Sequence, residues 1–190
     1  MQWFLAAKQF SNALAADEPT PGGGAAAAMA GSMGCALLLM ALGTTLKRKN
    51  TPAADRDVLK KYQRTLQGLH ATLQQYIEQD ADAYGAYVAA CRLPKENPAR
   101  PQAVQDALWL AACVPADTAA ACQRVLEVLT AAEEKIAPVI LSDVFCARHL
   151  LSSAEACCME NIRTNLSFIT DTERAAQLAR LLESYESSRK

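Results

Sequence analysis

The chain has 190 residues, of which 51% are hydrophobic and 21% charged, and its net charge is −1 at pH 7. This length allows one domain with a substantial core and leaves little room for two, so we expect a single domain over residues 1–190. The composition argues against disorder, and the balanced charge argues against nucleic acid as a partner. Seven cysteines without paired spacing, and an amphipathic opening segment where a secretory leader would stand, predict free thiols in the cytoplasm.

Helix signals follow one another along the chain, and strand-forming residues never alternate with polar ones. We therefore expect an all-α bundle of six or seven helices. The predicted helices run over residues 3–15, 23–46, 51–92, 100–113, 117–136, 142–169 and from 170 onward. Val114-Pro115 is expected to separate the fourth helix from the fifth. Helix caps are predicted at Thr51, at Ser142 with Asp143, and in a capping box from Thr170 to Glu173.

Residues 19–46 carry no charge, and this run is long enough to cross a bilayer. Most of the run is alanine and glycine, which contribute little to membrane insertion, and no aromatic belt flanks it. Small residues recur at every fourth position, at Gly23, Ala27, Gly31 and Cys35. This spacing suits close helix packing, so we expect a buried core helix and no membrane partner.

Polar residues interrupt the apolar seams of two predicted helices. In the third helix, large apolar residues alternate three and four apart up to Tyr76, and the next position in that register is Asp80. In the helix after Asp143, the same register leads to Asn161 and Asn165. Burying such groups costs several kcal/mol unless they find partners. They therefore either satisfy the protein's own groups, as Asp80 would by capping a neighbouring helix, or face a polar ligand.

The run Gly22-Gly23-Gly24 precedes the uncharged helix and has two interpretations. It is either a flexible turn or a place where the backbone approaches a ligand. It matches neither the dinucleotide-binding nor the P-loop pattern. Asp143, Cys146 and His149 lie three apart but lack a fourth zinc ligand, so we expect no metal site. No triad for nucleophilic catalysis can be built with any specificity.

Several short motifs occur in order over the whole chain. They are Pro19-Thr20-Pro21-Gly22-Gly23-Gly24-Ala25, Asp80-Ala81-Asp82-Ala83-Tyr84, Leu93-Pro94-Lys95, Val114-Pro115, Ser142-Asp143, and Asn161-Ile162-Arg163-Thr164-Asn165-Leu166 with Asp171. Together they resemble the cyclodeaminase/cyclohydrolase family of folate enzymes. This family includes the cyclodeaminase domain of formiminotransferase-cyclodeaminase and bacterial methenyltetrahydrofolate cyclohydrolases. One departure is Ala25, because the family's glycine run is usually followed by serine.

The resemblance implies a helical homodimer that binds a tetrahydrofolate derivative near the glycine turn and the subunit interface, without metal or other cofactor. It makes Asp80 the leading catalytic candidate. Lys95 is expected to assist or to bind the glutamate tail, for which the string from Lys47 to Lys49 is another candidate. Substrate contacts are expected at Pro21, Gly22, Gly23, Gly24, Asp143, Asn161 and Asn165.

Our first functional hypothesis is a formiminotetrahydrofolate cyclodeaminase. In that reaction N10 attacks the formimino carbon, ammonia departs and the methenyl bridge forms. A carboxylate with a raised pKa can take the N10 proton and protonate the leaving amine in turn. The second hypothesis is methenyltetrahydrofolate cyclohydrolase, in which water opens the same bridge. Asp80 can instead anchor the pterin edge, and a third hypothesis is a non-catalytic helical module that binds folate or a protein.

Overall fold

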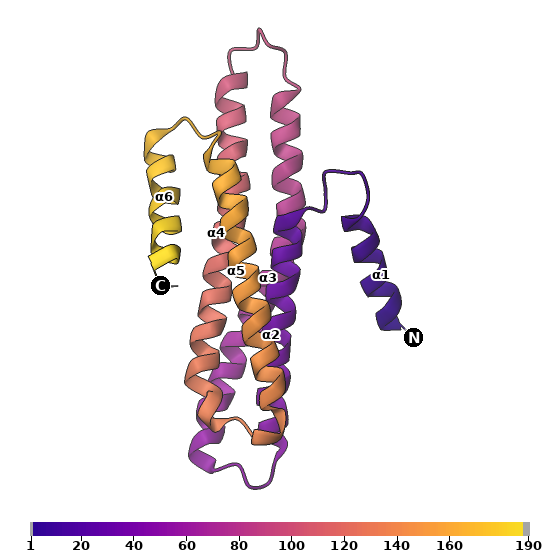
Figure 1. Cartoon of the computed structure of the whole chain (residues 1–190), viewed down its shortest axis with the longest axis vertical. Helices are drawn as coiled ribbons and strands as arrows, with labels where there is room; N and C mark the ends of the chain where they lie inside the picture. Colours follow the sequence, from indigo (N-terminus) through magenta and orange to yellow (C-terminus); the bar gives the residue numbers. More distant parts are fainter. Residues whose placement is uncertain (1, 188–190) are drawn as a thin grey trace.

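The computed structural model describes residues 2–187, and within this range it consists of helices joined by short loops, with no strand (Figure 1). The all-α prediction is confirmed. The described α-helices are α1 (Gln2–Leu14), α2 (Gly23–Lys47), α3 (Ala53–Cys91), α4 (Arg100–Ala132), α5 (Leu141–Leu166) and α6 (Thr172–Ser187), with short 3₁₀ turns η1 (Glu133–Lys135) and η2 (Pro138–Ile140) between α4 and α5.

Helices α2 to α5 form an elongated four-helix body, and α2 packs against α3, α4 and α5 (Figure 1). The small residues of α2 permit this packing. A Cβ atom added at Gly31 would lie 2.7 Å from Cys122 Sγ, and one at Gly34 would lie 2.8 Å from Leu151 Cγ. Neither position accepts a larger residue without a shift of its neighbours.

Among the described helices, α2 is the one long and apolar enough to cross a membrane by length and composition. Its most apolar window has a mean hydropathy of 1.9, and 56% of that window is buried inside the bundle. The core helix of a bundle meets the same criterion, and the packing described above gives α2 that position.

Helix α4 is continuous from Arg100 to Ala132, with Pro115 inside it, so the predicted break at Val114-Pro115 was wrong. A proline removes one backbone donor and leaves the carbonyl four residues earlier without its helical partner. Here that carbonyl belongs to Ala111, and it accepts a hydrogen bond from Asn165 Nδ2 at 3.0 Å. Both Val114 and Pro115 are buried, so packing also holds the helix together at this point.

The predicted caps also need correction. Helix α3 has no side-chain cap, and the Thr51 hydroxyl instead donates to the Thr45 carbonyl at 2.6 Å. Asp143 lies within the first turn of α5 and does not precede it. Helix α6 is capped by Asp171 and not by Thr170, because the Asp171 carboxylate accepts two backbone amides of the first turn at 3.0 Å.

Helix α1 stands apart from the body in Figure 1, and within residues 2–187 it makes no extensive contact with another helix. Trp3 is 84% exposed and Phe4 is 62% exposed. Phe10 is partly buried and faces a cavity beside α2 and α3. The 15–22 segment then crosses to the amino end of α2, where the polar residues considered next meet.

Candidate active site

The amino end of α2 meets α3 partway along its length, and Asp80 lies at this contact. The backbone amide of Ala25 donates to Asp80 Oδ2 at 2.8 Å. Gly22, which precedes the helix, supplies no side-chain cap. Asp80 therefore caps α2 from another helix, and its negative charge complements the positive end of the helix dipole. The sequence left two roles open for Asp80, a helix cap and a ligand contact. The structure shows the cap, and this contact uses one of the two carboxylate oxygens.

Gly24 is the glycine that this arrangement requires. A Cβ atom at position 24 would lie 2.0 Å from Asp80 Oδ1 and 2.6 Å from Asp80 Cγ, closer than nonbonded atoms approach. At Gly22 and Gly23 the nearest contacts of an added Cβ would be an ordinary 3.5 and 3.4 Å. No glycine among the described residues has a positive φ angle. The glycine run therefore allows a carboxylate to approach the backbone closely at Gly24. The backbone angles of the turn do not themselves require glycine.

The environment of Asp80 favours a carboxyl group that can exchange a proton. Burial raises its pKa, and the hydrogen bond from Ala25 opposes this shift without cancelling it. Within residues 2–187 the amides of Gly23 and Gly24 have no recorded acceptor, as expected at the first turn of a helix. A half-buried carboxylate and two backbone donors thus share the same small region.

The two asparagines of α5 have different roles in the structure. Asn161 Nδ2 donates to the Cys157 carbonyl of its own helix at 2.8 Å. The same nitrogen would lie 3.4 Å from a Cβ atom added at Gly23. Asn161 therefore borders the region around Asp80. Asn165 pairs with the carbonyl of Ala111 and ties α5 to α4. Both are half-buried, at the edge of a seam that continues through fully buried Ile162.

Two predicted site residues are not brought to Asp80 within one chain. Asp143 precedes Asn161 by 18 residues of α5, which is about 27 Å along the helix. Lys95 is exposed in the loop beyond Cys91, the end of α3, and the eleven helical residues after Asp80 alone span about 16 Å. Sequence motifs placed these residues together, but their positions along the helices separate them.

A cleft of about 330 Å³ lies beside the glycine run, between α1, α2 and α3, and we call it the side cleft. Pro21, one of the predicted contacts, forms part of its wall. Its other apolar lining residues are Phe10, Met29, Ile77 and Ala81, and its polar ones are Thr20, Gln74 and Glu78. Phe10, Gln74 and Glu78 could not be predicted from the sequence, because Phe10 is far away in the chain and the other two lie on a polar helix face with no unusual pattern.

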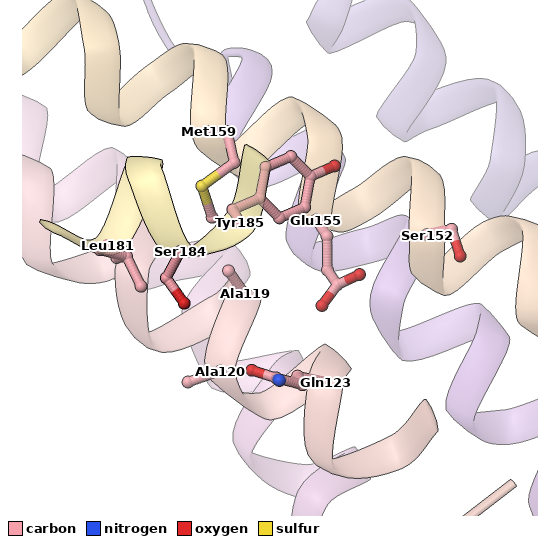
Figure 2. Close-up of a pocket in the computed structure, with 9 residues that line it drawn as sticks. All are labelled: Ala119, Ala120, Gln123, Ser152, Glu155, Met159, Leu181, Ser184 and Tyr185. Atoms are coloured by element: carbon pink, nitrogen blue, oxygen red, sulfur yellow. The ribbon is translucent and has the colours of Figure 1, made fainter. Parts of the chain in front are cut away.

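A second cavity, of about 290 Å³, lies between α4, α5 and α6 (Figure 2). Gln123, Glu155 and Tyr185 give it a polar lining, with Met159 and Leu181 as apolar neighbours. Its lining includes no residue of α2 or α3. This cavity is therefore separate from the region around Asp80.

The buried thiols offer no nucleophile. Burial raises the pKa of Cys35 and of Cys122 to about 12, so both remain protonated at neutral pH. Burial also raises the pKa of Cys158, and the negative charge of nearby Asp80 adds to this shift. All seven cysteines are free, and the described residues contain no group of three histidine, cysteine or acidic side chains placed to hold a metal. The chemistry that this site offers is proton transfer by a carboxyl group.

Comparison with known proteins gives three similarities. The sequence model of the formiminotransferase-cyclodeaminase family matches residues 6–184. A methenyltetrahydrofolate cyclohydrolase from Methylorubrum extorquens is 36% identical over 138 residues, which are 70% of this chain and 66% of that protein. The crystal structure of formiminotetrahydrofolate cyclodeaminase from Thermotoga maritima superposes with a TM-score of 0.85 at 25% identity, over 95% of this chain and 87% of the other.

The chain thus spans slightly less than two thirds of the cyclohydrolase that it resembles, and most of the structurally similar cyclodeaminase. The family match covers nearly the entire chain and includes the glycine run, Asp80 and Asn161. The chain belongs to the formiminotransferase-cyclodeaminase family, the cyclodeaminase/cyclohydrolase family of folate enzymes.

Proposed function

We propose that this protein is a folate one-carbon enzyme that acts on the bridge between N5 and N10 of tetrahydrofolate, with Asp80 as its acid/base group. The observation that supports the proposal is the position of Asp80 against the first turn of α2. One oxygen is held by the Ala25 amide, and a pKa raised by burial keeps the carboxyl group ready to accept and return a proton.

The reaction we propose is methenyltetrahydrofolate cyclohydrolase. Water attacks the methenyl carbon, and Asp80 accepts one of its protons. The bond from that carbon to N5 then breaks, the second proton of the water ends on N5, and Asp80 releases its proton to solvent. Positioned donors and acceptors lower the barrier for such steps because the charges that develop are already solvated by the protein.

Support for the hydrolytic direction comes from the Methylorubrum protein, which is the more similar in sequence and is named as a cyclohydrolase. Formiminotetrahydrofolate cyclodeaminase, our first hypothesis from sequence, becomes the second candidate. The fold similarity to the Thermotoga cyclodeaminase favours it, and it needs a proton acceptor and donor at the same place. The proton transfers of neither reaction require a cofactor.

The test is Asp80→Asn, which keeps the shape of the side chain and an oxygen that can accept the Ala25 amide but removes the titratable group. We expect turnover to fall about 10²- to 10⁴-fold while folding and folate binding persist. Asp82→Asn is the matched control, because Asp82 lies two residues along the same helix and is exposed. An Asp80→Asn variant that is as active as wild type would contradict the acid/base role.

The same assay separates the reactions. A cyclohydrolase consumes the methenyl absorbance of methenyltetrahydrofolate faster than buffer does, whereas a cyclodeaminase creates that absorbance from 5-formiminotetrahydrofolate. Wild-type protein that binds folate without changing either absorbance would favour a non-catalytic folate-binding module.

We also propose that the protein is a homodimer. Met33 and Met40 on the apolar helix α2 are 47% and 40% exposed, and the apolar side chains at the start of α1 are exposed as well. Assemblies commonly cover faces of this kind. We expect light scattering at micromolar concentration to give twice the chain mass of 20.4 kDa, and the mass of one chain would contradict the dimer.

A further inference from the structure

We propose that the side cleft holds the pterin ring of the substrate and that Glu78 pairs with the amidine edge of the ring, formed by the C2 amino group and N3–H. This inference rests on the proposed function in one respect: it takes the substrate to be a folate.

The side cleft adjoins the proposed catalytic group. Ile77 and Ala81, which line it, lie three residues before and one residue after Asp80 on α3. Pro21, on its other wall, directly precedes the glycine run. The cavity in Figure 2 lies among α4, α5 and α6 and contains no residue of α2 or α3, so a ring bound there would not present its atoms to Asp80.

The size of the side cleft selects part of the substrate. Its volume of about 330 Å³ is at the lower end of the range for small-molecule pockets. A cleft of this size suits a bicyclic ring and leaves no room for the aminobenzoyl-glutamate part of a folate. That part then extends past the glycine run into solvent.

The lining matches the chemistry of a pterin. Phe10, Pro21 and Met29 offer apolar surface to the faces of a flat ring. Glu78 is the one carboxylate among the described residues of the lining, and the lining contains no cation. A carboxylate accepts two hydrogen bonds from adjacent N–H donors, and the amidine edge presents such a pair. Gln74, one turn before Glu78, adds an amide for a neighbouring polar atom of the ring.

The order of these residues around α3 gives the ring an orientation. Successive helix residues are about 100° apart, so going round the helix from Glu78 one passes Ala81 and then Ile77 before reaching Asp80. A ring lying over Ala81 and Ile77 therefore has Glu78 at one rim and Asp80 at the other. In a pterin the amidine edge belongs to one of the fused rings and N5 to the other. Pairing the amidine edge with Glu78 thus places the ring that contains N5, one end of the bridge, on the side of Asp80.

The experiment compares two small probes that differ at this edge. Pterin carries the C2 amino group, and lumazine carries a carbonyl oxygen in its place, which a carboxylate repels. Binding of each to the full chain is measured by ligand-observed NMR for wild type, Glu78→Gln and Glu127→Gln. The last is a matched control, because Glu127 is an exposed glutamate on α4 outside the side cleft.

We expect wild type and Glu127→Gln to prefer pterin by about tenfold or more, because a site built for a donor edge rejects a ligand that lacks it. Glu78→Gln should lose that preference, since an amide has a donor and an acceptor and serves both rings. Phe10→Ala should weaken both probes several-fold and leave the preference intact. A wild-type protein without preference, or a Glu78→Gln variant that retains it, would overturn the inference.

Kinetics distinguish failure of this inference from failure of the proposed function. With an active enzyme, Glu78→Gln should raise KM while kcat stays within a few-fold of wild type, because Glu78 binds an edge remote from the reacting atoms. Turnover with an unchanged KM and an unchanged probe preference would reject Glu78 and leave the function standing. A probe preference that depends on Glu78, in a protein that turns over neither folate, would reject the function and leave the pterin cleft standing.

Discussion

Side chains of α3 form hydrogen bonds at both ends of α2, but the two contacts differ. At the carboxyl end, the Arg56 guanidinium donates from all three of its nitrogens, to the carbonyls of Leu46, Arg48 and Thr51. At the amino end, Asp80 accepts one amide, and its second oxygen packs against Gly24. The charges of both residues suit the helix dipole. Each of the three guanidinium nitrogens donates to a carbonyl, whereas the carboxylate keeps acceptor capacity and a raised pKa.

This difference separates a structural contact from a reactive one. The hydrogen bonds of the Arg56 guanidinium go to backbone carbonyls of the chain itself, and such contacts stabilise the fold. Asp80 is half-buried, and its second oxygen accepts no hydrogen bond from residues 2–187, so the carboxylate can change its protonation state when a substrate arrives. The contact between α2 and α3 is thus structural at the carboxyl end of α2 and includes a proposed catalytic group at the amino end. Three substitutions test this contrast.

The largest effect is expected from Gly24→Ala. The new methyl group would lie 2.0 Å from the present position of Asp80 Oδ1, so the carboxylate must move away from the helix end. We expect activity to fall about 10²- to 10⁴-fold, as for loss of the acid/base group itself. Gly43→Ala is the control, because the nearest atom to its added Cβ is 3.8 Å away and alanine favours helices. Steady-state kinetics and circular dichroism of both variants measure the result, and an active Gly24→Ala enzyme would break the contrast.

A smaller effect, on stability alone, is expected from Arg56→Met. The carbonyl of Leu46 in the last turn of α2, and those of Arg48 and Thr51 just beyond it, lose a charged donor. We expect a loss of about 2 kcal/mol, or about 4–8 °C in Tm. Activity per folded molecule should not change. Arg64→Met, at an exposed position of the same helix with no hydrogen bond or ion pair recorded within residues 2–187, should melt like wild type. Loss of kcat in folded Arg56→Met would show that the two ends are not functionally distinct.

The smallest effect is a pH dependence specific to the amino end. Burial raises the pKa of Asp80 in the folded protein, so the folded chain binds this proton more readily than the unfolded chain does. Stability from this group is therefore lost as pH rises through the raised pKa and regained as pH falls toward about 3.9, the ordinary value for aspartate. On acidification the Tm of wild type should rise relative to that of Asp80→Asn. The difference between wild type and Arg56→Met should stay constant, and a constant difference for both variants would refute the raised pKa.

The fold could be predicted in most respects because helix signals are local. The apolar seam of α3 placed Leu66 and Leu73 in the core, and it marked Asp80 as the exception. The exception was informative because a carboxylate in a seam needs a partner from another element. Pro115 was misread for a related reason. Its effect on α4 depends on Asn165 of α5, which satisfies the freed carbonyl of Ala111 and cannot be identified from the sequence of α4.

By itself, the sequence determined that the chain is helical, that α2 is a core helix, and that Asp80 and two asparagines are anomalous on their seams. Only the tertiary structure decided which of these polar groups meet: Asp80 with Gly24 and Ala25, Asn161 beside Gly23, and neither Asp143 nor Lys95 with them. It also decided that a cleft opens next to Asp80. The physical reason is that helical periodicity fixes the direction of a side chain around its own axis. The offset between packed helices fixes which side chain reaches a helix end, and the packing of the whole core sets that offset.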